Sequence, residues 1–315
     1  MLAYSLRRIP SGLTILAVSS VVIFFLLRAT GGDPAAVKAG PDSPPETIAA
    51  IRAELGLDRP IIVQFFDWLA SLFNGNLGNS LVTNAPIGEL IGNGLQATLL
   101  LTLAATILAV VMGGTLGVLM ATVRNRPVQI VVNAVTGVLL AVPTYVSGVL
   151  LIFVFAVILG VLPVGGHVDF FDDPEIAVQY LLLPALCLAM PAAAVVARFL
   201  ASSMRQVMDE DFIRTGQAKG LSQRRLLTHH IVPNSLPPVF TILGIEIGQM
   251  LGGAIVVEAI FAWPGIGGVL AQAVLTRDYF LVQDILLIAV AVFVIMQILT
   301  DLAHAAVDSR VRLGV

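Results

Sequence analysis

The amino-acid sequence predicts an all-α integral membrane protein with six transmembrane helices. Of the 315 residues, 57% are apolar and only 12% are charged, whereas about 25% of the residues are charged in a typical soluble domain. The mean hydropathy is +0.95. Charge-free runs recur along the chain, and several reach the roughly 20 apolar residues that a helix needs to cross the hydrocarbon core of a bilayer.

The six predicted spans divide the chain. They occupy residues 9–29, 93–122, 130–161, 178–199, 238–261 and 283–305. The first is too long for the apolar core of a signal peptide and has no small-residue cleavage site after it, so we expect it to be retained. The predicted parts are an N-terminal segment with the first span (1–29), an extracytoplasmic helical segment (30–92) and a permease core (93–315) with a cytoplasmic loop at 200–237.

The distribution of basic residues predicts the orientation, because cytoplasmic loops retain Lys and Arg. With the N-terminus inside, twelve of the seventeen basic residues are cytoplasmic: Arg7, Arg8, Arg124, Arg126, Arg198, Arg205, Arg214, Lys219, Arg224, Arg225, Arg310 and Arg312. Five lie outside: Arg28, Lys38, Arg52, Arg59 and Arg277. Both termini are therefore predicted to be cytoplasmic.

The extracytoplasmic segment contains two predicted helices. Ser43 is expected to cap the first, with Pro44 at its first position, and Gly56 to end it after Ala53. The second, Ile61–Phe73, is amphipathic. It either lies on the membrane surface or the spans, or is a packed helix without a partner of its own.

The loop between the fourth and fifth spans carries an unusual density of charge, from Asp211 to Pro233. A helix leaving the fourth span is expected to continue to about Lys219 and to stop at Gly220. Ser222 then caps a short helix, Gln223–Ile231, which Pro233 ends. The pattern predicts a compact helix-turn-helix knob. The alternative is a solvated loop that is attracted to lipid headgroups and merely obeys the positive-inside rule.

Polar and helix-breaking residues inside the spans mark a candidate translocation path. Glu246 is the foremost, because a carboxylate at the bilayer centre costs about 3 kcal/mol and usually faces a bundle interior. Gln249, Gly253 and Glu258 follow at roughly helical spacing, with Gly252 beside them. The alternative is a neutral Glu246 that is hydrogen-bonded to a neighbouring helix. Helices that bend as the path opens are expected at Pro143 with Ser147, and at Pro184 with Pro191.

Catalytic and cofactor motifs are missing from the sequence. The two lysines, Lys38 and Lys219, are in no GxxxxGK[ST] phosphate loop, so ATP cannot bind in that way. The four histidines show no zinc spacing, and no nucleophile and base stand together, so the chain is not expected to be an enzyme or to hold a metal or cofactor. Cys187 is expected to be a packing residue. The first and last three spans show no internal repeat, which predicts a symmetry mate that completes the path.

A series of short motifs, in order along nearly the whole chain, resembles the B-type permease of dipeptide, oligopeptide and nickel ABC importers. They are Leu6-Arg7-Arg8, Gly32-Asp33-Pro34, Leu55-Gly56-Leu57-Asp58-Arg59-Pro60 with Gln64 and Trp68, Gly75-Asn76-Leu77-Gly78, the Asp211–Pro233 loop, Glu258-Ala259-Ile260-Phe261, Pro264-Gly265-Ile266-Gly267, Arg277-Asp278-Tyr279 and Asp308-Ser309-Arg310-Val311-Arg312. The family more often has proline in place of Gly31 and Ser309, and often aspartate in place of Asn76.

The resemblance implies a permease that forms half of the translocation path of an ATP-driven importer in a bacterial cell membrane. A sister permease would complete the path, two ATPase sites that bind ATP and Mg would dock on the knobs, and an extracytoplasmic binding protein would deliver the substrate. The expected ATPase-coupling residues are Arg214, Thr215, Gly216, Ala218, Lys219, Gly220, Leu221 and Pro233. The path would be lined by Pro143, Ser147, Glu246, Gln249, Gly253 and Glu258.

Peptide is the expected cargo, with nickel chelates and haem-like ligands as alternatives. The binding protein is expected to touch residues 30–93 and the Pro264–Gly267 loop. From another class, a proton-coupled secondary transporter with Glu246 as the proton carrier remains the rival hypothesis.

Overall fold

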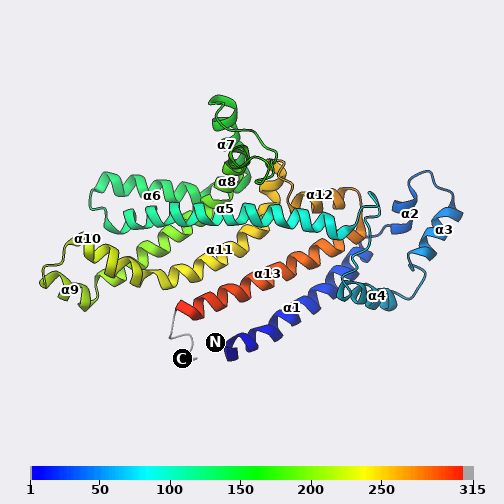
Figure 1. The fold of residues 1–315 in the computed structure, drawn as a ribbon, viewed down its shortest axis with the longest axis horizontal. Coiled ribbons are helices and arrows are strands. Elements are labelled where there is room, and N and C mark those ends of the chain that lie inside the picture. Colours follow the sequence, from blue (N-terminus) through cyan, green and yellow to red (C-terminus); the bar gives the residue numbers. More distant parts are fainter. Residues whose placement is uncertain (1, 308–315) are drawn as a thin grey trace. The chain divides into compact units, whose positions relative to one another are not determined.

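The computed structural model describes the backbone of residues 2–307 and the side chains of residues 10–298. The described chain is built from helices (Figure 1). Its α-helices are α1 (Leu2–Ala29), α2 (Pro34–Ala39), α3 (Pro45–Glu54), α4 (Ile61–Phe73), α5 (Ile87–Thr122), α6 (Arg126–Ala141), α7 (Thr144–Leu151), α8 (Pro174–Met208), α9 (Asp211–Ala218), α10 (Gln223–Leu226), α11 (Val232–Ile260), α12 (Ile266–Leu275) and α13 (Tyr279–Val307). Two π-helical segments, η1 (Ile152–Ile158) and η2 (Leu227–Ile231), follow α7 and α10. The resemblance motif Asp308–Arg312 lies outside the described residues.

Five helical stretches of the described chain are long and apolar enough to cross a membrane, and a bent pair makes a sixth. The all-α membrane fold is thus confirmed. The predicted span at residues 130–161 is a broken one: the chain bends by 108° between α6 and the α7–η1 stretch, next to Pro143, one of the positions where a bend was expected. Val142, between them, is extended with ψ of 122°, as expected for a residue whose helical conformation is disfavoured by a following proline, here Pro143.

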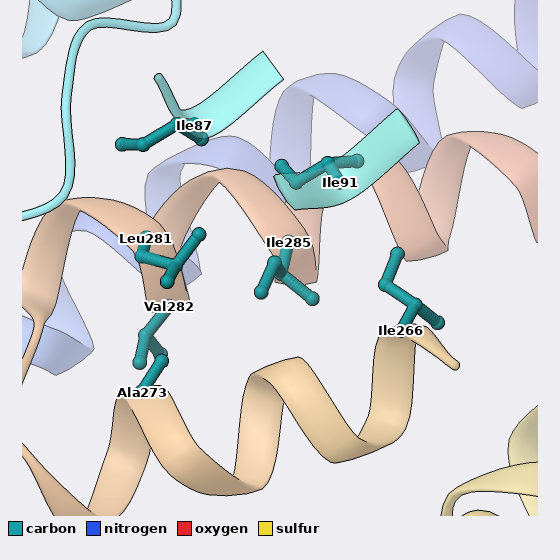
Figure 2. Packing of buried hydrophobic residues seen from close by; sticks show 7 residues of the cluster. All are labelled: Ile87, Ile91, Ile266, Ala273, Leu281, Val282 and Ile285. Atoms are coloured by element: carbon teal, nitrogen blue, oxygen red, sulfur yellow. The ribbon is translucent and has the colours of Figure 1, made fainter. Parts of the chain in front are cut away.

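The described chain forms two compact units. One is built around Leu99–Trp263, and the other comprises Leu6–Thr98 and Pro264–Ile295. The second unit has a core in which Ile87 and Ile91 of α5 pack with isoleucine, leucine and valine side chains of α12 and α13 (Figure 2). Burial of each such side chain stabilises the fold by about 1.5–3 kcal/mol.

In the first unit, α5 and α8 approach closely at glycines. A Cβ at Gly113 would lie 2.7 Å from the Ala193 carbonyl oxygen, and one at Gly117 would lie 2.9 Å from that of Ala197. Small residues spaced four apart are a common way for helices in a membrane to come into close contact. The helix α8 itself continues through Pro184 and Pro191 without a break.

The two predicted extracytoplasmic helices are present. Gly56 has a φ of 66° and donates its backbone NH to Ala53. The NH of Leu57 reaches back to Arg52, which completes a glycine-terminated helix end. The prediction that Ser43 caps α3 is wrong: its hydroxyl donates to the carbonyl of Ala39, at the end of α2. The second helix, α4, has the predicted bounds.

Candidate functional site

The charged loop folds into two short helices, α9 and α10, that we call the knob (residues 209–231). The predicted continuation of the fourth span to Lys219 is wrong, because α8 ends at Met208 and Glu210 is extended with ψ of 146°. This break redirects the chain so that Ile213 is 1% exposed and joins a core with Met204 and Leu226. The knob is therefore packed onto α8 and α11 rather than solvated on all sides.

Two glycines shape the knob. Gly220 has a φ of 78°, its NH donates to Gln217, and the NH of Leu221 donates to Gly216, so α9 ends where the sequence predicts. Gly216 is buried, and a Cβ there would lie 2.8 Å from Leu226 Cδ2 and 3.3 Å from Leu221 Cδ1. Gly216 is thus the point of close contact between α9 and α10, where an added side chain would have to displace the ends of two leucines.

The second half of the knob is only partly as predicted. Ser222 caps α10 and its hydroxyl accepts a hydrogen bond from the NH of Arg225, as expected. The prediction that Pro233 ends this helix is wrong, because α10 continues through η2 into α11. Pro233 lies in the first turn of α11, where the missing NH of a proline is tolerated.

The outer surface of the knob presents exposed polar and basic side chains, including those of Arg214, Thr215 and Lys219. Arg214 lies 3.5 Å from Asp211, but the two side chains are 70% and 97% exposed, so this ion pair contributes at most about 1 kcal/mol. Phe212 is 47% exposed in the same helix. Sequence reasoning missed it, although an aromatic residue between charged ones in a predicted docking loop was a usable signal.

Next to the knob, Arg205 of α8 donates a hydrogen bond of 2.8 Å to the carbonyl of Met120, near the end of α5. A guanidinium at the C-terminal end of a helix satisfies an orphan carbonyl and interacts favourably with the helix dipole. The contact ties α5 to the helix that leads into the knob.

The residues predicted to line a path differ in their burial. Within the first unit, Ser147, Glu246 and Glu258 are buried, whereas Gln249 and Pro143 are exposed. Pro143 lies at the 108° bend, and Gly253 of α11 faces α8, since a Cβ there would lie 3.7 Å from Leu188 Cδ1. The predicted stripe on α11 therefore spans a buried and an exposed face.

Glu246 is 7% exposed, and none of the residues that the structure describes hydrogen-bonds its carboxyl group. The alternative of a neutral Glu246 bonded to a neighbouring helix thus finds no partner in this part of the chain. One turn further along α11, Met250 accepts a hydrogen bond of 3.7 Å from Thr106 of α5. Among the described residues no group of three His, Cys, Asp or Glu side chains could hold a metal ion.

Comparisons with known proteins cover the chain from end to end. Residues 113–313 match the family model described as binding-protein-dependent transport system inner membrane component, and residues 1–102 match that of its N-terminal part. The probable peptide ABC transporter permease protein y4tP of Sinorhizobium fredii is 37% identical over 98% of this chain and 99% of its own. The glutathione transport system permease protein GsiC of Salmonella choleraesuis is 36% identical over 99% of both chains.

Solved structures show a similar fold. A chain from the inward-facing MetNI methionine ABC transporter matches with a TM-score of 0.60 at 20% identity, over 71% of this chain and 98% of the other. A chain from an amino acid ABC transporter crystallised with histidines matches with a TM-score of 0.52 at 22% identity, over 70% and 94%. At such identities the likeness concerns the fold.

Proposed function

Because the chain belongs to the family of binding-protein-dependent transport system inner membrane components, we propose that it is the permease subunit of an ATP-driven importer of peptides. The relatives named above are described as permeases for peptides and for glutathione, itself a tripeptide. In this role the chain forms half of a translocation path, and hydrolysis of ATP takes place on separate subunits.

The structure of the knob is the observation that best supports this proposed role. Its inner side is anchored by Ile213, Leu226 and Ile231 in a core shared with α8 and α11, while Arg214, Thr215, Ala218 and Lys219 are exposed. A body that is rigidly attached to two spans and offers a polar outer surface suits the transfer of motion from a docked ATPase. The glycine-terminated end of α9 and the close contact at Gly216 keep the two short helices in one geometry.

The path is proposed to lie along α11, with a sister permease supplying the opposite wall. The bend at Pro143 and the buried Ser147, Glu246 and Glu258 are the residues of this unit that we assign to it. Closure of the ATPases moves the knob, and the spans that flank it tilt so that the cavity opens to the other side. A loaded binding protein must favour one of the two states, because a ligand shifts an equilibrium only by its differential affinity.

The coupling role is tested by co-purification of the tagged chain with its candidate ATPase, at matched expression. Gly220→Pro forces φ to about −65° where 78° is needed and removes the NH that donates to Gln217. Gly220→Asn is the matched control, because Asn tolerates the left-handed conformation and keeps the NH. We expect wild type and Gly220→Asn to retain the ATPase. The amount of ATPase that co-purifies with Gly220→Pro should be at least tenfold lower.

If wild type retains no ATPase and still transports after reconstitution alone, the importer assignment fails and the proton-coupled alternative takes its place. If Gly220→Pro retains the ATPase as well as Gly220→Asn does, the knob is not the docking element, although the importer assignment stands.

A further inference from the structure

A cavity of about 580 Å³ is lined by residues of the second unit, whereas the residues assigned above to coupling and transport all belong to the first unit. Its walls come from the end of α1, residues 54–59, α4, the 74–78 turn and the start of α13. Its volume is in the range of small-molecule sites, about 300–1,000 Å³.

Asp284 places a carboxyl group in the cavity wall. The residue is 3% exposed, and the indole Nε1 of Trp68 donates a hydrogen bond to its Oδ1 at 2.8 Å. No described residue donates to Oδ2, and no cation of the described chain pairs with this carboxylate. An ionised carboxylate that is removed from water is costly without a cation or further donors. The free oxygen therefore calls for an additional donor.

Arg28 supplies a positive charge, and its guanidinium is hydrogen-bonded only to neutral groups of the described residues. Its guanidinium donates to Gln283 Oε1 at 3.0 Å, to the carbonyl of Phe24 at 3.3 Å and to Gln64 Oε1 at 3.5 Å. It stacks over the Phe24 ring at 3.3 Å. No carboxylate of the described residues lies within ion-pair distance of it.

The other charged residues of the cavity wall are already neutralised. Arg59 pairs with Asp67 at 2.6 Å, and Glu54 pairs with Lys38 at 3.0 Å. What remains is the Arg28 guanidinium and the Asp284 carboxyl group, which form no ion pair with each other and each have hydrogen-bonding capacity to spare. A metal ion would leave Arg28 unmatched, and a simple anion would leave Asp284 unmatched.

We propose that this cavity is a binding site for a small zwitterion, a free amino acid or a short peptide, whose ammonium group binds Asp284 and whose carboxylate binds Arg28. Charge-assisted hydrogen bonds to both ends are about twice as strong as neutral ones. The apolar part of the ligand would lie against Trp68, Leu77 and Phe280, which also line the cavity.

The two tryptophans of the chain make a direct test possible. Trp68 touches the proposed ammonium site, and Trp263 belongs to the other unit, so Trp263→Phe leaves Trp68 as the only reporter. The purified permease, without ATPase or binding protein, is titrated with L-alanine and with L-alanyl-L-alanine while indole fluorescence is followed. We expect a saturable change with at least one of them, and which one responds distinguishes amino acid from peptide.

Two blocked ligands test each end without any change in the protein. N-acetyl-L-alanyl-L-alanine lacks the ammonium group, and L-alanyl-L-alaninamide lacks the carboxylate, so each should bind at least tenfold more weakly than the free dipeptide. Asp284→Asn should weaken binding of the free dipeptide equally, whereas Glu46→Gln, an exposed residue of α3 outside the cavity wall, should change its Kd less than twofold.

Absence of any saturable change with L-alanine and the dipeptide, or equal binding of the free and blocked dipeptides, would overturn the proposal and leave the Trp68–Asp284 pair as a structural tie. This test needs neither ATP nor transport. A failure here therefore leaves the importer assignment intact, and a failure of that assignment does not change the binding result.

Discussion

Two adjacent glycines of α5 have different surroundings, although the sequence does not distinguish them. Gly113 faces α8, where a Cβ would lie 2.7 Å from the Ala193 carbonyl oxygen and 2.8 Å from Val196, whereas a Cβ at Gly114 meets nothing within 4 Å. A backbone oxygen cannot move aside as the end of a flexible side chain does. A side chain at Gly113 therefore requires α5 and α8 to move apart, whereas a side chain at Gly114 does not.

Gly113→Ala is expected to destabilise the protein by about 1–3 kcal/mol, the usual cost of overpacking. Gly114→Ala is expected to be neutral or to stabilise by up to about 1 kcal/mol, because alanine loses less backbone freedom in a helix. Thermal unfolding of both variants in the same detergent measures the difference. Equal midpoints for the two would mean that α5 and α8 are not in contact at Gly113.

Gly216 is limited by space, while Gly220 is limited by its backbone conformation. A Cβ at Gly216 would lie 2.8 Å from Leu226 Cδ2, and one at Gly220 meets nothing within 4 Å. We expect Gly216→Val to separate α9 from α10 and to reduce ATPase co-purification at least fivefold. Arg214→Ala, on the exposed side of α9, should lower it less than threefold if backbone geometry decides docking. The opposite ranking would assign recognition to the Arg214 side chain.

At the scale of elements, a partly buried hydrogen bond links α4 to α13. Trp68 Nε1 donates to the carboxyl group of Asp284 at 2.8 Å, across 216 residues of sequence. Stacking of Trp68 with Phe24 of α1, at 5.7 Å between ring centroids, adds to the contact. For the amphipathic helix α4, the sequence allowed either a surface position or a packed one. The structure shows that it is packed within the second unit.

Trp68→Phe keeps an aromatic side chain, although a smaller one, and removes the NH donor, so it leaves the buried carboxyl group of Asp284 without its partner. The expected cost is about 1–3 kcal/mol, which should appear as faster hydrogen exchange of residues 61–73. Asp67→Asn breaks only the exposed ion pair with Arg59, worth at most about 1 kcal/mol, and should leave the exchange of α4 unchanged. Similar exchange in both variants would show that α4 is held by its apolar side alone.

The elements that sequence reasoning predicted correctly are those with local causes. Gly56 and Gly220 end helices because only their own backbone conformation is needed, and the bounds of α4 follow from its flanking residues. Predictions failed where distant packing intervened. The break at Glu210 changes the direction of the chain, so that Ile213 packs in a core with Met204. Pro233 does not end a helix, because it lies in the first turn of α11, where a proline is tolerated.

At the scale of the whole molecule, Glu246 separates the two mechanisms. An ATP-driven importer needs no proton carrier, so Glu246→Gln, which removes the charge at nearly constant volume, should keep ATP-driven uptake within about threefold in vesicles with the binding protein and ATPase. Proton-coupled transport predicts complete loss. The matched control is Gln249→Glu, three residues along on an exposed face of the same helix. Loss with Glu246→Gln and uptake without ATPase together would contradict the importer mechanism.

The sequence by itself determined the membrane class, the approximate spans, the position of the knob and the family resemblance, because these depend on composition and on residues close together in the chain. Only the tertiary structure decided which glycines are contact points, where the third span bends, that Glu246 is buried and that Arg28 and Asp284 line one cavity. Arg28 and its partner Gln283 are 255 residues apart. A contact of that kind arises from the packing of several helices at once, and no local pattern encodes it.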